Sequence, residues 1–457
     1  MLISPKKINY ETFLINSLFS FIPISFIAGN LVLNINILLF LICAIYFRGK
    51  DVLKINLYFI DKLIIIFFAY VLIAGLFNNF FFKDSKIFPD NIIFIKTVFY
   101  LRFLLFYFAI RIMVEKNIIN FKTFLILCSI CSYFVCLDLI YQFNFGKDIF
   151  GYTSNDPRRL GGPFGDEMIA GTYLQRFAIF TFFLILIFFK IKKKFYLSVL
   201  LFSTFILFLI SIIISGNRIP IILFLILMLC VFSSYAKIRK YLIPLFVSVT
   251  LIIGILLSVN QNIKDHFGHF NNKIIESVDF FSTIIIKDKK SKIVELPGNV
   301  KGQYEVTVNG KLVQIPNNYI KELNSGYQTW LKNKYIGGGI KSFHKNCQRS
   351  GKSFNILNCS SHPHNYYLEI LSEIGIVGLI LLIIIILKIF VDNLIKRNMF
   401  SYSLEKNGII VPFIFLFLLE MFPVRTTGSF FTTGNATYIF LVMAITIALS
   451  RSNDKKT

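Results

Sequence analysis

The segment from Ile374 to Phe390 reads IGIVGLILLIIIILKIF, and its only charged residue is Lys388. A helix of this length rises about 26 Å, close to the thickness of a bilayer's hydrocarbon core. Comparable blocks run from Leu63 to Phe82 and from Phe195 to Ile214. Because backbone polar groups inside a bilayer must pair within their own segment, these blocks predict an all-α polytopic membrane protein.

The whole chain follows the same pattern. It has 457 residues, 56% of them hydrophobic, and the apolar residues come in long blocks. These blocks predict about 12 transmembrane helices, near 13–29, 31–47, 63–82, 92–112, 122–141, 173–190, 195–214, 219–235, 241–259, 366–391, 409–422 and 434–449. The last two are short, so a re-entrant pair is the alternative there.

The formal charge of +24 comes from short basic clusters between the apolar blocks. With the N-terminus placed inside, the predicted inner segments hold 23 Lys and Arg residues, whereas the short outer loops hold seven. Cytoplasmic loops carry such an excess, so both termini are predicted to be cytoplasmic and the first helix to be a retained signal anchor. The clusters therefore indicate topology and contact with membrane lipids, and they argue against nucleic acid as a partner.

This topology divides the chain into three parts. Residues 1–259 form an N-terminal transmembrane region of about nine helices, 260–365 a periplasmic loop subdomain, and 366–457 a C-terminal transmembrane region of about three helices. Inside the loop, Gln303–Val308 and Lys311–Ile315 flank Asn309-Gly310, which favours a short β-hairpin. A helix from Tyr327 to Lys334 is expected to lie at the membrane interface, with Trp330 facing it.

Cys347 and Cys359 lie close together in this exported, hydrophilic stretch, and an oxidising compartment would allow them to form a disulfide. The other five cysteines lie in apolar segments, where the simplest interpretation is a small core residue.

Four polar segments are all predicted to lie outside: RRLGGPFG (158–165), SGNR (215–218), HPHN (362–365) and PVRTTGS (423–429). Arg218 occupies a short turn between two apolar spans. It is either an arginine that extends to lipid headgroups or a guanidinium placed to bind phosphate. Arg158 and Arg159 have the same two interpretations within a glycine-rich loop, and Arg425 is a secondary candidate.

His362 and His364 precede a helix that begins near Tyr366, where Asn365 is suited to be the N-cap. A zinc site would need more ligands at compatible spacing, and a histidine near neutral pH suits the role of a general base better. The first outer loops contain no D-x-D carboxylate pair to hold a metal on a diphosphate. We therefore expect no metal and no cofactor.

Several of these motifs together resemble a known family. GGGIKSF (337–343), Cys347, Cys359 and HPHNYYLEILSEIGIVGL (362–379) are similar to the C-terminal signature of the O-antigen ligase and O-antigen polymerase superfamily. The turn at 215–218 resembles its earlier S-G-x-R element. The hydrophobic layout, the long late outer loop and the motif order extend the resemblance over most of the chain.

The resemblance implies a GT-C-like enzyme of the bacterial inner membrane that moves a glycan from undecaprenyl pyrophosphate to an acceptor sugar hydroxyl, without metal. Family arginines from separate periplasmic loops hold the pyrophosphate, and a histidine lies beside the transfer site. These roles fall on Arg218, on Arg158 or Arg159, and on His364, with His362 and Asn365 as further candidates.

Three activities remain open at this point. The first is an O-antigen ligase that uses lipid A-core as acceptor in lipopolysaccharide biosynthesis. The second is a polymerase that uses another lipid-linked repeat, or a ligase for another glycan acceptor. The third is a transporter or flippase of lipid-linked sugars, for which charges deep in the membrane would argue. The charged residues within or near the ends of apolar segments are Lys96, Arg102, Asp138 and Glu420.

Overall fold

The computed structural model describes residues 9–81, 91–154, 156, 159–189, 193–235, 239–259, 261, 264–265, 268, 292–294, 305–308, 311–314, 318–348, 359–395, 408–423 and 428–454. The predicted site residues Arg158 and Arg425 and the predicted turn Asn309-Gly310 lie outside them.

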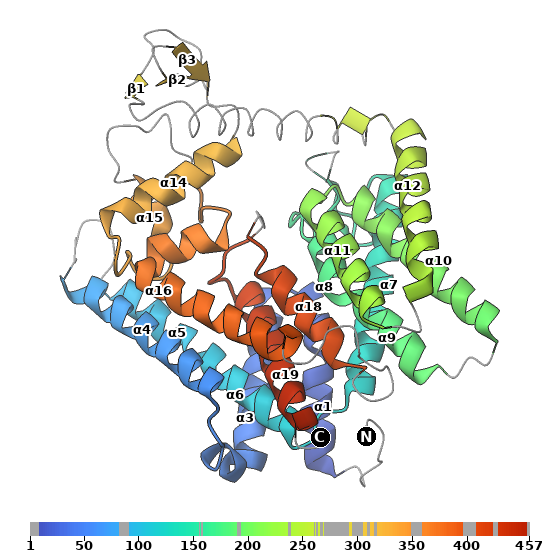
Figure 1. Cartoon of the computed structure of the whole chain (residues 1–457), viewed down its shortest axis with the longest axis horizontal. Helices are drawn as coiled ribbons and strands as arrows, with labels where there is room; N and C mark the ends of the chain where they lie inside the picture. Colours follow the sequence, from blue (N-terminus) through green and yellow to red (C-terminus); the bar gives the residue numbers. More distant parts are fainter. Residues whose placement is uncertain are drawn as a thin grey trace.

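Helices make up nearly all of the fold (Figure 1). The N-terminal region contains α1 (Tyr10–Ser20), α2 (Ile22–Ile27), α3 (Asn30–Leu53), α4 (Phe59–Phe81), α5 (Ile92–Tyr100), α6 (Arg102–Glu115), α7 (Phe121–Phe145), η1 (Gly162–Phe164), α8 (Ala170–Phe177), α9 (Ile179–Phe188), α10 (Lys194–Ile214), α11 (Arg218–Ser234), η2 (Arg239–Tyr241) and α12 (Leu242–Val259). The rest contains β1 (Lys292–Val294), β2 (Glu305–Val308), β3 (Lys311–Gln314), α14 (Asn318–Lys332), α15 (Phe343–Gln348), α16 (Tyr366–Phe390), η3 (Val391–Ile395), α18 (Ile410–Glu420) and α19 (Thr433–Asp454).

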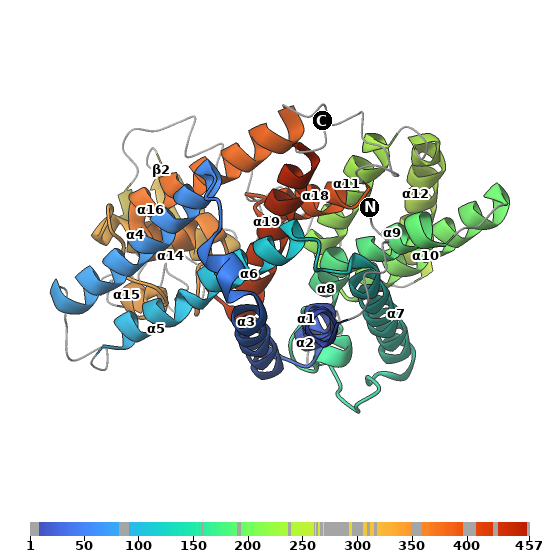
Figure 2. The ribbon, with the colours of Figure 1, turned by 90° about the horizontal axis from the view of Figure 1, so that it is seen from below.

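The helices form two groups with a shared centre. In Figure 1, α4, α5, α14, α15 and α16 lie on the left and α7 to α12 on the right. The view from below in Figure 2 places α6, α18 and α19 between the two groups. In this centre α19 packs against α6 and α18, and Phe440 stacks on Phe103 with 6.2 Å between the ring centroids.

Nine of the helical segments in the described part of the chain are long and apolar enough to cross a membrane. Three shorter apolar helical segments, Arg218–Ser234, Phe246–Ile255 and Ile410–Glu420, fall within the remaining predicted spans. The outer surface agrees with this, since α16 exposes Ile380, Ile384 and Leu387, and a large exposed apolar face suits lipid better than water. The prediction of an all-α polytopic membrane protein is confirmed, whereas the number of helices that cross remains a prediction.

Several predicted spans are interrupted helices. The first is α1 followed by α2, with Phe21 between them and Pro23 in the first turn of α2. Proline fits the first turn of a helix but not its interior, so the break falls there. The predicted spans 92–112 and 173–190 are likewise the pairs α5–α6 and α8–α9.

Polar contacts gather at the ends of the helices. At one end, ion pairs join segments that were all predicted to be cytoplasmic: Arg48 to Glu11 at 3.4 Å, Lys116 to Asp51 at 3.5 Å and Arg451 to Asp392 at 4.0 Å. There the fully buried Arg111 also lies 2.6 Å from Asp61. Contacts between the segments predicted to be outer lie at the opposite end, which carries α14 and the strands (Figure 1). These ion pairs bring several segments predicted to be cytoplasmic together at one end of the helices, while the topology and the identity of the cytoplasmic side remain predictions.

The described part of the long outer loop contains both β-strands and helices. Strand β2 pairs antiparallel with β1 and with β3, and Val308 is opposite Lys311. Helix α14 begins nine residues earlier than the predicted interfacial helix and ends two residues sooner, at Lys332. The Trp330 indole N–H donates to the carbonyl oxygen of Lys334 at 2.9 Å, which closes the C-terminal end of this helix.

Candidate active site

The Ser215–Arg218 turn connects two apolar helices. Ser215 ends α10, Gly216 has a φ of +69° that suits glycine, and Arg218 is the first residue of α11. The Asn217 side-chain amide donates to the Ser215 hydroxyl oxygen at 3.2 Å and so stays inside the turn. Because a helix N-terminus and a guanidinium both favour anions, the half-buried Arg218 occupies a position suited to phosphate.

The glycine-rich loop packs directly on this turn. The backbone N–H of Leu160 donates to the carbonyl oxygen of Ser215 at 3.3 Å, and that of Gly162 donates to Gln142 Oε1 on α7 at 2.9 Å. In α8, a Cβ added at Gly171 would lie 2.5 Å from the Ser215 hydroxyl oxygen, so only glycine allows this approach. The structure thereby brings the loop that carries Arg159 against the turn that carries Arg218.

The histidine segment lies at the start of α16. The Asn365 side chain accepts from the backbone N–H groups of Tyr367 and Leu368 at 3.0 and 3.2 Å, which makes it the N-cap of the helix. Its amide nitrogen donates to the Pro423 carbonyl oxygen at 2.9 Å. The cap therefore also fixes the start of α16 to the residues that lead to Arg425.

The two histidines are neighbours, with 4.3 Å between their ring centroids. Burial, together with the positive charges of His364 and Lys341, lowers the pKa of His362 to about 4. His362 is therefore uncharged at neutral pH. His364 has a φ of +50° and its Nε2 lies 3.8 Å from a carboxylate oxygen of Glu322 on α14. Of the two imidazoles, His364 is the one with a carboxylate beside it.

The segment from Gly337 to Gly339 fills a break in α16 at Gly375. The N–H groups of Gly338 and Gly339 donate to the carbonyl oxygens of Ser372 and Glu373 at 2.9 and 2.7 Å. On the other side of the break, the Ile376 N–H donates to the Lys334 carbonyl oxygen at 2.9 Å. Backbone groups that a break would leave unpaired are thus satisfied. The family-like glycine motif consequently has a structural role in holding α16.

Two buried carboxylates lie one turn apart in the first half of α16. Glu373 accepts from the backbone N–H groups of Lys341 and Phe343 at 2.7 and 3.4 Å. Glu369 accepts from the Ser429 hydroxyl and, at 2.6 Å, from the Phe430 N–H. The Lys341 ammonium donates to the Ser429 hydroxyl oxygen at 2.8 Å. The Ser429 hydroxyl, which the lysine contacts, and the backbone donors together satisfy the oxygen atoms of these buried carboxyl groups.

A buried ion pair connects the two halves of the site. Arg176, five residues after Gly171 on α8, forms an ion pair with Glu420 at the end of α18. Glu420 Oε1 also accepts from the hydroxyl of Tyr366 at 3.0 Å, and Tyr366 is only two residues after His364. The helix that supports the Arg218 turn is thus joined through charged groups to the helix that supports the histidine.

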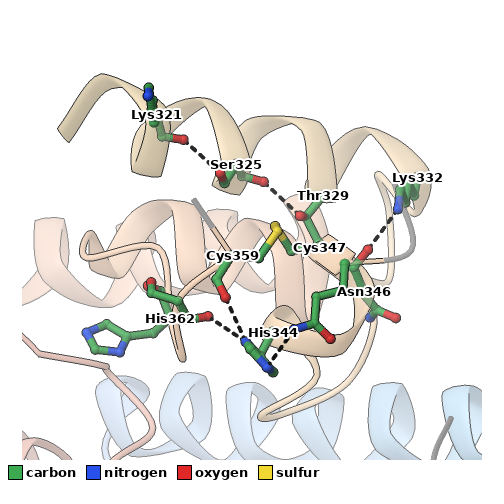
Figure 3. Close-up of a disulfide and its surroundings, with 11 residues drawn as sticks. Lys321, Ser325, Thr329, Lys332, His344, Asn346, Cys347, Cys359 and His362 are labelled. Atoms are coloured by element: carbon green, nitrogen blue, oxygen red, sulfur yellow. Dashed lines mark hydrogen bonds between the residues drawn. A yellow bond between two sulfur atoms is a disulfide. The ribbon is translucent and has the colours of Figure 1, made fainter. Parts of the chain in front are cut away.

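Cys347 and Cys359 form a disulfide, with 5.6 Å between their Cα atoms (Figure 3). Beside it, His344 Nδ1 lies 2.7 Å from the Cys359 carbonyl oxygen, while Gln348 Nε2 lies 2.9 Å from His344 Nε2. A carbonyl oxygen can only accept, so His344 donates to it from Nδ1. The disulfide and this histidine hold the segment before His362 against α15.

The structure therefore assembles two groups of predicted residues, Arg159 with Arg218 and His362 with His364 and Asn365. Sequence reasoning missed Arg176, Glu322, Lys341, Glu369 and Glu373. For three of them a signal was present, because Arg176, Glu369 and Glu373 are ionisable residues inside predicted spans, and such residues usually have a function or a partner. In the described part of the chain, no three His, Cys, Asp or Glu residues are grouped so as to hold a metal ion.

Fold and site together define a polytopic membrane protein whose polar functional groups are gathered at one end of its helices. Residues 202–383 match the family described as O-antigen ligase. This region runs from α10 to α16 and includes the Ser215 turn, the glycine motif and the histidine segment, so the predicted resemblance to that family is confirmed for this part of the chain. No curated protein gives a match. The family carries out glycosyl transfer of the O-antigen ligase type, with a lipid-linked glycan and an acceptor as partners.

Proposed function

We propose that this protein is a metal-independent, inverting glycosyltransferase of the bacterial inner membrane that moves a glycan from undecaprenyl pyrophosphate to an acceptor sugar hydroxyl. The favoured acceptor is lipid A-core, which makes the protein an O-antigen ligase of lipopolysaccharide biosynthesis. The observation that carries the proposal is the charged connection from Arg176 through Glu420 to Tyr366. This connection joins the Ser215–Arg218 turn, which is suited to bind an anion, to the imidazole of His364. Both lie at the end of the helices that is predicted to be periplasmic.

The donor half of the site consists of Arg218 with Arg159 or Arg158. A pyrophosphate is a good leaving group once its charge is compensated, so fixed guanidinium groups lower the barrier without a metal or an acid. The backbone N–H groups of Arg218 and Ile219, ahead of Pro220 in the first turn of α11, are suited to the same anion. The lipid tail of the donor lies in the membrane, beside the helices.

The transfer step follows from these groups. The acceptor oxygen forms a bond to the anomeric carbon while the bond from that carbon to the pyrophosphate oxygen breaks, which inverts the anomeric configuration. His364 takes the hydroxyl proton as general base, and undecaprenyl pyrophosphate leaves with its negative charge held by the arginines. Arg425 and the long outer loop contribute to the choice of acceptor.

Purified protein in detergent tests the proposal directly. With undecaprenyl-pyrophosphate-linked glycan and core-only lipopolysaccharide, a ligase produces core that carries the glycan, visible as a ladder or band shift on a gel. A polymerase instead lengthens the lipid-linked glycan and leaves the core unchanged. Activity that persists in EDTA supports metal independence, whereas activity that EDTA removes and Mg²⁺ or Mn²⁺ restores contradicts it.

The transporter alternative predicts no covalent product, because detergent removes the two compartments that transport requires. Of the charges that favoured it, Glu420 is paired with Arg176 and Asp138 accepts from the Ile149 N–H at 2.8 Å. Arg102 donates to the Thr433 hydroxyl oxygen at 3.2 Å. These contacts give three of the four charges, Glu420, Asp138 and Arg102, structural partners, which favours an enzyme over a transporter.

A further inference from the structure

Helix α14 approaches the histidine segment closely. A Cβ added at Gly326 would lie 3.0 Å from the Cβ atoms of both Pro363 and Leu368, which flank His364. Ser325 and Thr329 on the same helix are buried, and their hydroxyls donate to carbonyl oxygens four residues earlier, as Figure 3 shows. The missing side chain at Gly326 therefore allows α14 to lie directly on the start of α16.

Glu322 is one helical turn before Gly326, so it is on the same face of α14. Its Oε1 lies 3.8 Å from His364 Nε2, and the two side chains are 14% and 34% exposed. This distance allows an ion pair but is too long for a good hydrogen bond. Catalytic contacts are often long without substrate and shorten when the complex forms.

The second imidazole does not compete for this carboxylate. Burial is the main reason that the pKa of His362 is lowered to about 4, so His362 has no positive charge at neutral pH. Its Nδ1 is 2.9 Å from the Ser361 hydroxyl, whereas its buried Nε2 has no hydrogen-bond partner among the described residues. His362 packs beside His364, and it is the His364 ring that Glu322 contacts.

We propose that Glu322 is a positioning residue for His364, an inference that rests on the proposed glycosyl transfer. A carboxylate only accepts hydrogen bonds, so Glu322 selects the tautomer that carries its proton on Nε2. Nδ1 is then the atom that accepts the proton of the attacking hydroxyl. As that proton arrives, the adjacent carboxylate stabilises the imidazolium. The general base thus depends on a helix of the long outer loop, and displacement of α14 impairs transfer even when the donor site is intact.

The test compares Glu322→Gln and Glu322→Asp with the matched control Asp265→Asn. Asp265 is an exposed carboxylate before the strands that accepts from Gln261 on its own helical turn at 2.8 Å. We expect Glu322→Gln to lower kcat about tenfold to a hundredfold with little change in KM. This loss is part of the rate enhancement of roughly 10²–10⁴ that a general base contributes. Glu322→Asp should recover much of this loss, and the control should match the wild type. Equal loss in the Asp and Gln variants, or in the control, would overturn the proposal.

A double variant separates positioning from a purely structural role. In a His364→Asn background, Glu322→Gln should cause no further loss of kcat, because the carboxylate acts through the imidazole. A full additional loss would show that Glu322 acts elsewhere. If the wild type itself transfers no glycan, the proposed function fails. If the wild type transfers glycan and His364→Asn does not, full activity in Glu322→Gln rejects only the role of Glu322.

Discussion

Gly375 and Tyr335 are in such close contact that a Cβ at Gly375 would lie 2.1 Å from the Tyr335 carbonyl oxygen. Gly375 also has a φ of +69°. We predict that Gly375→Ala destabilises the protein by several kcal/mol, because strain of about 1–2 kcal/mol adds to a clash with the backbone. Thermal unfolding of the purified protein in detergent measures this.

Gly254→Ala is the matched control. Gly254 is an exposed residue of α12, and a Cβ added there would meet no atom within 4 Å. An alanine at this helical position should be neutral or slightly stabilising. A similar loss in both variants would show that the cost arises from helix propensity or detergent rather than from the contact with Tyr335.

The Gly375 break shows where prediction from sequence ends. Apolar length and basic flanks are local properties, so each predicted span coincides with one helix or with two consecutive helices. The break is not local, because its unpaired backbone groups are satisfied by residues 334–339. The sequence around Gly375 is like that around any glycine within a long apolar helix. Nothing in this local sequence identifies residues 334–339 as the segment that fills the break in α16.

The candidate site divides in the same way. Asn365 was predicted as an N-cap because the cap and its N–H groups are adjacent in sequence. Glu322 pairs with a histidine 42 positions later, and this needs the packing of Gly326 on Pro363. Arg176 and Glu420 are 244 positions apart, yet each is recognisable by itself as an ionisable residue in an otherwise apolar segment. Sequence can thus indicate that such a residue needs a partner, whereas the fold determines which one.

We predict that the disulfide between Cys347 and Cys359 is present in the mature protein. After denaturation without reductant, a thiol reagent should label the five other cysteines, and reduction should increase the number to seven. Labelling of all seven before reduction would contradict the bond and weaken the topology. Cys347→Ser should destabilise the protein by roughly 3 kcal/mol, since the bond closes a loop with a sequence separation of 12. Cys43→Ser, at a half-buried free thiol, is the control.

His362 should make the stability depend on pH. The pKa of this imidazole is lowered in the folded state from 6.5 to about 4. Between pH 4 and pH 6.5 the imidazole of the unfolded chain binds a proton and that of the folded chain does not. The contribution of His362 to the free energy of unfolding is therefore fully present above pH 6.5 and is lost as the pH falls toward 4. The upper limit of this loss of unfolding free energy is about 3 kcal/mol. The expected loss is smaller than the limit because the side chain is only partly buried.

The free energy of unfolding at pH 7.5 and at pH 4.5 measures this loss. We expect the wild type to lose more than His362→Asn between these two conditions, because the asparagine does not titrate. The difference between the two proteins isolates His362 from the other groups that titrate in this range. Equal losses in both would mean that His362 is protonated as easily in the folded state as in the unfolded chain.

The last prediction concerns the donor site. Lysine in place of Arg218 keeps the charge that an interfacial residue needs but loses the two-pronged hydrogen-bonding geometry that suits phosphate. Arg218→Lys should therefore lower glycan transfer roughly a hundredfold to a thousandfold, the usual effect of losing one donor to a developing negative charge, while folding is unchanged.

Arg425→Lys should lose less glycan transfer, because a polar Thr-Thr-Gly-Ser sequence follows Arg425 and gives it water and other partners. Arg239→Lys is the structural control, since Arg239 lies beyond the far end of α11 and its guanidinium donates to the carbonyl oxygen of Ser233 in the last turn of that helix. Transfer per folded molecule is the measurement. Full activity in Arg218→Lys would assign this arginine to the lipid headgroups and remove the main support for a pyrophosphate site at the start of α11.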